Sequence, residues 1–385
     1  MFKKILFSLI FIALALLFIE LAGHIFYRSV KGVWVWEVPK QHDIFNIRAF
    51  TELVDDGRIV TNSKNYNCVV SRNRVYLREI KEGEKGSWSV KTDSNGFRIG
   101  KNSYSTEKNN IVFLGDSVPF GWGIEGDQSV PSRFYELAMK DSPVRSGIIN
   151  AAIPSYSLYQ AGERYKYEID GKFPVKYVIL QIYDPSLQFV MWGRKWDRKM
   201  CWSSKDTLIS FEDIVREQVG KRNFLLELIR EHSFIYHAIY CLRLRLKKTE
   251  DMPLRLDLED REAFEFFEKE NISVLEDLHA LIEKEDAVLI ILPVNPERPL
   301  SSYAPGAFNN LGEKQKKLLV SIDFLNDILR KFASTHADVY YFDIITRFEK
   351  MGRKGLFIDG CHLSEEGAQK QAEFILEQMK ANGLV

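Results

Sequence analysis

Cysteine is scarce in this 385-residue chain, and neither sign of charge is in excess. Its 4 cysteines are too few for a disulfide scaffold, and no C-x-x-C pair is present to hold a structural zinc ion. The 53 basic and 53 acidic side chains give a formal net charge of zero. Because phosphate contacts need a surplus of Lys and Arg, this balance argues against nucleic-acid binding. The remaining composition, 45% hydrophobic and 28% charged, is typical of a folded globular protein, so function has to be sought in local residues.

The longest hydrophobic run lies at the N-terminus. Residues 5–19 contain one weakly polar side chain, Ser8, and the run continues to Tyr27 with Glu20 and His24 near its far end, where an anchor tolerates them. As a helix this segment is about 35 Å long, enough to cross a hydrocarbon core of about 30 Å. A cleaved signal peptide is the alternative, but residues 20–23 fit its small-residue cleavage site poorly. We therefore expect residues 1–31 to be a single-pass membrane anchor that leaves the rest of the chain outside the cytoplasm.

The pattern of residues in the remaining chain changes near residue 109. Residues 32–108 mix short aromatic and β-branched runs with Gly, Asn and Asp, which predicts a β-rich cap next to the membrane. Beyond it, apolar β-branched runs lie at 111–114, 144–152, 175–183, 287–294 and 338–344, and helical patterns lie at 127–140, 158–170, 258–284 and 313–336. This alternation predicts an α/β domain over residues 109–385, with a mostly parallel sheet covered on both faces. Residues 186–256 interrupt the alternation and predict a helical insertion.

The first of these predicted strands leads directly into Gly115-Asp116-Ser117. In an open α/β sheet, ligands and catalytic groups collect at the carboxyl ends of the strands. An ordinary turn is the alternative, with Gly at the bend and a polar residue that caps a helix. The tripeptide by itself does not decide between the two.

A second polar group lies near the C-terminus, where Asp359 and His362 precede a predicted helix start at Ser364. A spacing of three residues on a turn lets the carboxylate reach the imidazole ring. A serine hydroxyl becomes a good nucleophile when an imidazole takes its proton, and that imidazole needs a partner on its other nitrogen. Ser117, His362 and Asp359 supply these three parts, so we expect them to form a catalytic triad.

The two motifs resemble those of the SGNH (GDSL-type) serine hydrolases and acyltransferases. Residues 111–124 are similar to the nucleophile block of that family, and residues 359–375 are similar to its terminal Asp-x-x-His block. The hydrophobic N-terminus and residues 90–99 are similar to a subgroup with an N-terminal membrane segment. The resemblance covers residues 109–385 in outline. It implies a flavodoxin-like three-layer sandwich, a Ser-His-Asp triad and no metal or organic cofactor.

Two middle blocks depart from the family pattern, in which a Gly and an Asn complete the oxyanion hole. Ser155 stands at the glycine position, and Tyr183 stands at the asparagine position. A backbone N–H survives at Ser155, whereas tyrosine has a single donor on a longer arm. The resemblance thus implies an oxyanion hole built from the N–H groups of Ser117 and Ser155. Tyr183 is a third candidate donor whose reach does not match that of asparagine.

Two other patterns near these motifs have plainer explanations. Residues 121–126 match G-x-G-x-x-G, but a dinucleotide fingerprint follows its strand directly, and here Gly115-Asp116-Ser117 intervenes. Cys361 lies between the expected triad members Asp359 and His362. We expect its side chain to point to the opposite side of the turn, as a small buried residue.

The sequence therefore predicts a membrane-anchored, exported esterase that cleaves an acyl ester through an acyl-enzyme on Ser117. Within the same family, the alternative is an O-acetyltransferase or deacetylase of cell-envelope polysaccharide, with an acylated glycan as substrate. An alternative from another class is a non-catalytic envelope module that keeps the fold.

Overall fold

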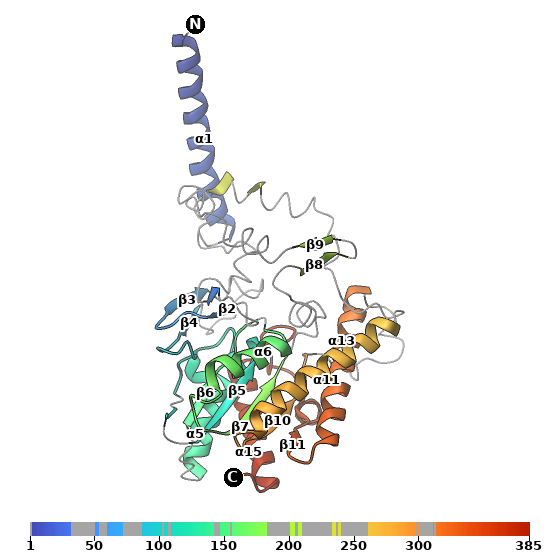
Figure 1. The fold of residues 1–385 in the computed structure, drawn as a ribbon. Coiled ribbons are helices and arrows are strands. Elements are labelled where there is room, and N and C mark those ends of the chain that lie inside the picture. Colours follow the sequence, from blue (N-terminus) through green and yellow to red (C-terminus); the bar gives the residue numbers. More distant parts are fainter. Residues whose placement is uncertain are drawn as a thin grey trace. The chain divides into compact units, whose positions relative to one another are not determined.

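The structure is a computed structural model (Figure 1). It describes residues 2–31, 51–53, 60–71, 87–101, 104–106, 109–141, 147–154, 156–182, 201–204, 207–209, 233–235, 238–239, 261–297, 299, 311 and 313–385. The chain divides into two compact units, one made of Met1–Asn46 and Ile209–Met252, the other of Ile47–Leu208 and Pro253–Val385.

The first unit contains α1 (Phe2–Lys31), which covers the segment predicted to be a membrane anchor. Large apolar side chains along this helix are exposed, among them Phe7, Phe11 and Phe18. Within the described part of the chain, no helix combines the length and the apolarity needed to cross a membrane. The anchor over residues 1–31 therefore stays a prediction.

A five-stranded sheet forms the centre of the second unit. Its strands are β5 (Asn110–Gly115), β6 (Gly147–Asn150), β7 (Val175–Gln181), β10 (Val288–Leu292) and β11 (Val339–Tyr341). Their spatial order is β11-β10-β7-β5-β6, and every neighbouring pair is parallel. Counted along the chain this is the order 2-1-3-4-5, a doubly wound arrangement that reverses between β5 and β7. Ligands of such sheets bind where the order reverses, at the carboxyl ends of the strands.

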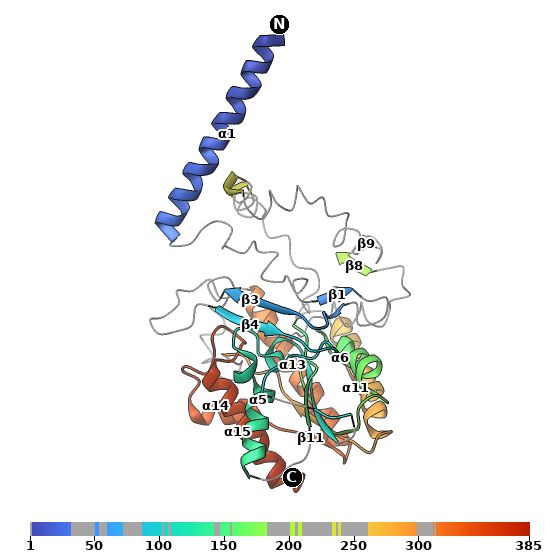
Figure 2. The ribbon, with the colours of Figure 1, turned by 90° about the vertical axis from the view of Figure 1, so that its left-hand side faces the viewer.

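Helices cover both faces of this sheet (Figure 2). The helical elements are α4 (Ser117–Phe120), η3 (Gly126–Gln128), α5 (Val130–Asp141), α6 (Leu158–Arg164), η4 (Tyr165–Ile169), α11 (Arg261–Glu283), α13 (Glu313–Thr335), α14 (Ile344–Met351) and α15 (Glu365–Ala381). One face carries α6, α11 and α13, and the other carries α5, α14 and α15.

Successive side chains of each strand point to opposite layers, which explains why the central positions of the strands, such as 111–114 of β5, are apolar. Phe113 of β5 faces α5, where its ring centroid lies 5.6 Å from that of Phe134. Its neighbour Leu114 joins the apolar cluster on the other face. A strand buried on both sides needs apolar residues at every position, so it appears in the sequence as a continuous run. The predicted α/β fold with a parallel sheet is confirmed.

Short two-stranded sheets accompany the parallel sheet. They pair β1 (Thr51–Leu53) with β2 (Val60–Asn62), β3 (Asn67–Ser71) with β4 (Ser87–Lys91), and β8 (Cys201–Ser204) with β9 (Thr207–Ile209). The first four strands lie in the segment predicted as a β-rich cap. β8 and β9 lie in the predicted insertion at 186–256, most of which is outside the described residues. The bounds predicted for the cap (32–108) and for the insertion stay predictions.

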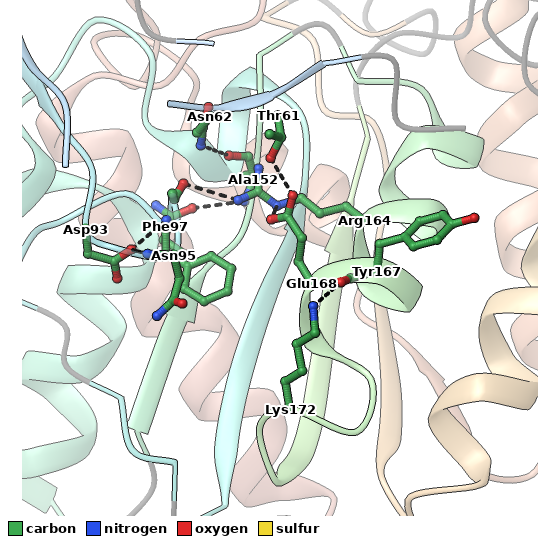
Figure 3. A network of polar contacts seen from close by, with 12 residues as sticks. Thr61, Asn62, Asp93, Asn95, Phe97, Ala152, Arg164, Tyr167, Glu168 and Lys172 are labelled. Atoms are coloured by element: carbon green, nitrogen blue, oxygen red, sulfur yellow. Dashed lines mark hydrogen bonds and ion pairs between the residues drawn. The ribbon is translucent and has the colours of Figure 1, made fainter. Parts of the chain in front are cut away.

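Polar contacts join the β2 strand to the α/β layers (Figure 3). Thr61 donates a hydrogen bond to Glu168 of η4, whose Oε2 lies 3.0 Å from Nε of the fully buried Arg164. Asn62 Nδ2 donates to the carbonyl oxygen of Ala152, just after β6, at 3.5 Å. These contacts hold β2 against η4 and against the loop that follows β6.

Candidate active site

The β5 strand ends in a turn that requires glycine. Gly115 has a φ of +145°, and a Cβ placed on it would lie 1.9 Å from the carbonyl oxygen of Gln181 in β7. The next residue, Asp116, caps α4, because its Oδ1 accepts the N–H of Val118 at 3.0 Å. Ser117 is therefore the first residue of α4, and it is half-buried at the carboxyl end of the sheet.

A buried guanidinium binds the other end of α4. Arg98, only 1% exposed, donates from Nη1 to the carbonyls of Phe120 and Gly121, the latter at 2.6 Å. Its Nη2 donates to the carbonyl of Ile124 at 2.7 Å. Charge-assisted hydrogen bonds are among the strongest in proteins, and a cation is favoured at a helix C-terminus. Arg98 therefore positions the short helix that begins with Ser117.

Arg98 reaches this place through a local turn. Asp93 Oδ1 accepts the backbone N–H groups of Asn95 at 2.8 Å and Phe97 at 2.9 Å (Figure 3). Arg98 then donates its own N–H to the carbonyl of Asn150, the last residue of β6, at 3.1 Å. Sequence reasoning missed Arg98, because the alternation of polar and apolar residues carries no signal for a buried arginine.

The glycines of the G-x-G-x-x-G pattern shape the loop after α4. Gly121 ends this helix with a left-handed φ of +83°, and Gly126 begins η3. Between them, Trp122 is 6% exposed and packs edge-on against Trp88, with ring centroids 5.0 Å apart. The Trp122 centroid is also 6.4 Å from that of the His362 ring, so this loop packs beside the candidate site.

His362 lies in a loop that Asp359 shapes. Asp359 Oδ1 accepts two backbone hydrogen bonds, from the N–H of Cys361 at 2.9 Å and from the N–H of His362 at 2.7 Å. Ser364 then caps α15 through its hydroxyl oxygen, which confirms the helix start predicted from the sequence. The loop thus enters α15 with the imidazole on the same side as the carboxylate.

Three side chains form a hydrogen-bonded chain between the nucleophile turn and this terminal loop. Ser117 Oγ lies 2.9 Å from His362 Nε2. On the other side of the ring, Nδ1 lies 2.7 Å from Asp359 Oδ2. The structure therefore brings together the three residues that the two motifs singled out, although Ser117 and His362 are 245 positions apart in the sequence.

Burial and hydrogen bonding act in opposite directions on the Asp359 carboxyl. Burial raises its pKa, but the hydrogen bond and charge attraction of the His362 ring, with two backbone N–H groups, outweigh that effect. The pKa of Asp359 consequently lies below its ordinary value. The ionised carboxylate favours the tautomer with the proton on Nδ1, which turns the lone pair of Nε2 toward Ser117. This arrangement can accept the Ser117 proton when the hydroxyl attacks an electrophile.

The predicted oxyanion donors fall partly outside the described residues. The Ser117 N–H belongs to the first turn of α4, close to the hydroxyl of the same residue. Ser155 and Tyr183 lie outside the described residues. The oxyanion roles expected for them stay predictions.

Cys361 points toward the carboxylate and the imidazole, so the prediction that it faces the opposite side of the turn is wrong. Its Sγ lies 3.5 Å from His362 Nδ1, and the residue is half-buried. The physical reason is the curl of the loop, in which Asp359 Oδ1 binds both following N–H groups. A carboxylate oxygen, a sulfur and a ring nitrogen consequently lie within 4.8 Å of one another, a set of ligand types that can hold a metal ion.

No protein-family model and no curated protein matches this chain. Among solved structures, the chain is similar to LAE5, an α/β hydrolase enzyme from the metagenome of Lake Arreo, Spain, with 13% identity, a TM-score of 0.41, and 73% of this chain and 99% of that chain covered. It is also similar to Axe2, an acetylxylan esterase from Geobacillus stearothermophilus, with 12% identity, a TM-score of 0.39, and coverage of 72% and 96%. A member of the lipolytic G-D-S-L family from Veillonella parvula gives 12% identity, a TM-score of 0.37, and coverage of 70% and 97%. Likenesses this distant do not bear on the activity or the substrate of this chain.

Proposed function

We propose that this protein is an esterase of the SGNH (GDSL) type. Ser117 is its nucleophile, His362 its general base, and Asp359 the residue that orients the imidazole. The observation that carries the proposal is the 2.9 Å contact between Ser117 Oγ and His362 Nε2, continued by the 2.7 Å contact between Nδ1 and Asp359 Oδ2. Both distances are within the reach needed for proton transfer. The position of Ser117 after β5, beside the reversal of strand order, also supports a ligand site.

The chemistry follows from these contacts. Ser117 Oγ attacks the carbonyl carbon of an acyl ester while its proton moves to His362 Nε2, and Asp359 stabilises the resulting imidazolium. The oxyanion accepts the Ser117 N–H, with Ser155 and Tyr183 as further candidate donors. The imidazolium then protonates the departing alkoxide, which leaves the acyl group on Ser117. A water molecule, deprotonated by the same imidazole, releases the acid and restores the serine.

Intact-mass analysis after treatment with a fluorophosphonate tests this proposal. We expect one adduct per wild-type chain and none on Ser117→Ala, because the reagent reacts with a serine activated by a neighbouring base. In His362→Ala, labelling should slow by about 10³-fold or more, since the hydroxyl loses its proton acceptor. A folded wild-type chain that stays unlabelled contradicts the proposal and favours a non-catalytic module.

The acceptor of the acyl group distinguishes an esterase from an acyltransferase. Both form the same acyl-enzyme on Ser117, which water resolves in hydrolysis and a sugar hydroxyl resolves in transfer. We expect an acyl donor, supplied with and without candidate envelope glycans, to release its acyl group into solution in both cases. Acyl groups recovered on the sugar would indicate transfer instead.

We further propose that residues 1–31 hold the enzyme on a membrane, with its hydrolase domain outside the cytoplasm. The apolar run at 5–19 and the exposed Phe7 and Phe18 of α1 support this location. The full chain should stay in the membrane pellet after alkaline carbonate extraction and should be cleaved by protease added from outside. Extraction into the supernatant, or full protection from the protease, would argue against it.

A further inference from the structure

The thiol of Cys361 contacts the proposed catalytic base, although the esterase mechanism gives this thiol no role. Its Sγ is 3.5 Å from His362 Nδ1, the same nitrogen that lies 2.7 Å from Asp359 Oδ2. The side chains of His362 and Asp359 are 17% and 28% exposed, so a small solute has access to the group. The proposed mechanism uses the carboxylate and the imidazole, and it assigns no task to the thiol.

The three ligand atoms are of the kinds that zinc and related cations prefer, namely thiolate sulfur, imidazole nitrogen and carboxylate oxygen. Zn–S and Zn–N bonds of about 2.3 and 2.0 Å at a tetrahedral angle place sulfur and nitrogen about 3.5 Å apart. The distance from Cys361 Sγ to His362 Nδ1 is 3.5 Å. A carboxylate ligand would lie about 3.4 Å from that nitrogen, so Asp359 Oδ2 has to draw back by roughly 0.7 Å from its 2.7 Å contact.

The backbone of the loop holds these ligands in place without the cation. Asp359 Oδ1 accepts the N–H groups of Cys361 and His362, which leaves Oδ2 on the side of the ring. The N–H of Ile358 donates to the His362 carbonyl at 2.9 Å and closes the loop. Little conformational entropy is therefore lost when the three groups bind one ion.

We propose that Asp359, Cys361 and His362 form a binding site for a thiophilic divalent cation such as Zn²⁺, and that the bound cation inhibits the esterase. On binding, the Cys361 thiol releases its proton to solvent, the metal binds His362 Nδ1, and the proton that Nδ1 carried is transferred through solvent to Nε2. The ring then carries its proton on Nε2, so that nitrogen can no longer accept the proton of Ser117. The site itself stands on the geometry of the loop, whereas the inhibition rests on the proposed function.

Cobalt provides a readout of the site that needs no activity. The metal-free, reduced full chain, titrated with Co²⁺, should develop the near-ultraviolet absorption of a thiolate–cobalt bond with one equivalent bound, and added Zn²⁺ should remove it. Cys361→Ser and Cys361→Ala should lose this absorption. Cys68→Ser, which removes a thiol elsewhere in the chain, is the matched control and should keep it. If the cobalt absorption is missing in the wild type, or unchanged in both Cys361 variants, no such site exists.

Fluorophosphonate labelling tests the inhibition, as the ratio of rates with and without Zn²⁺ within each variant. Saturating Zn²⁺ should slow labelling of the wild type by about 10-fold or more, because the base is blocked. In Cys361→Ser, the Zn²⁺ concentration that halves the rate should rise by about 10-fold or more, since a soft ligand is lost. A Cys361-dependent cobalt signal with labelling indifferent to Zn²⁺ would overturn the inhibition. A wild type that labels at no metal concentration would sink the esterase proposal, and the cobalt titration would still decide the site.

Discussion

The turn that carries Ser117 and the loop that carries His362 are held in opposite ways. The turn depends on distant parts of the chain, because the carbonyl of Gln181 crowds Gly115 and Arg98 binds the carbonyls at the end of α4. The loop depends on itself, because Asp359 Oδ1 accepts the N–H groups two and three residues further on.

The two regions should therefore affect different measurements, the stability of the folded state in one case and catalytic turnover in the other. The groups that hold the nucleophile turn are buried, so changing them disturbs packing and hydrogen bonds that stabilise the folded state. The groups that shape the terminal loop are partly exposed, and the second carboxylate oxygen of Asp359 contacts the imidazole. We therefore expect substitutions in the turn to act on unfolding and substitutions in the loop to act on turnover. Three measurements test whether the two regions differ in this way.

The largest effect is expected from Asp359→Asn in the terminal loop. The amide oxygen can still accept the two backbone N–H groups, but the amide nitrogen then faces His362 Nδ1 and favours the tautomer with the proton on Nε2. Turnover of a short-chain acyl ester should fall by about 10³-fold or more, because Nε2 can no longer accept the Ser117 proton. The midpoint of urea unfolding at neutral pH should fall only slightly, by the small contribution of the charged carboxylate. A loss of turnover smaller than tenfold would contradict the proposed role of Asp359.

A matched pair of glycine substitutions compares the two regions directly. At Gly115, a Cβ would meet the Gln181 carbonyl oxygen at 1.9 Å with φ at +145°, so Gly115→Ala should destabilise the fold by about 3 kcal/mol. At Gly360 in the terminal loop, no heavy atom lies within 4 Å of the same position. Gly360→Ala should therefore change the free energy of unfolding by less than about 0.5 kcal/mol. Equal effects of the two changes in urea titrations would break the comparison.

The smallest effect is an acid dependence of stability that belongs to Asp359. Because the pKa of this carboxyl is lower in the folded chain than its ordinary value of 3.8, the unfolded chain binds its proton more readily. The stability that the carboxylate contributes is thus complete above that ordinary value and is lost as the pH falls through the folded-state pKa. The difference in unfolding free energy between wild type and Asp359→Asn should shrink along this path. If this difference in unfolding free energy stays constant down to the lowest pH at which both proteins remain folded, the fold does not stabilise the charged form of Asp359.

Sequence patterns predicted most of the second unit because its elements follow local rules. The run at 111–114 is apolar at every position, as a strand buried on both faces must be, and it became β5. Ser364 before two acidic residues predicted the start of α15 for an equally local reason, the capping of unpaired N–H groups. The candidate site was found through the motifs around Ser117 and His362. Ser155 and Tyr183 lie outside the described residues, so the expectations for them are still untested.

The residues that sequence reasoning missed are those whose surroundings come from elsewhere in the fold or from the curl of a loop. No sequence pattern identifies a buried arginine such as Arg98, because its role depends on the backbone carbonyls to which it donates hydrogen bonds in the folded chain. The side of the turn on which Cys361 emerges depends on backbone dihedrals that Asp359 selects, and residue spacing alone does not specify them.

Short-range patterns in the amino-acid sequence predict which segments form the five strands of the parallel sheet, because side-chain burial on a strand acts over a few residues, although β6, β7 and β11 are shorter than the predicted runs. The sequence also determined which side chains have the chemistry of a nucleophile and a base. Only the tertiary structure decided that Ser117 and His362, 245 positions apart, lie 2.9 Å from each other. The assembly of the parallel sheet and the packing of α15 beside α5 set that distance, and both are collective results of burying apolar surface from the whole unit.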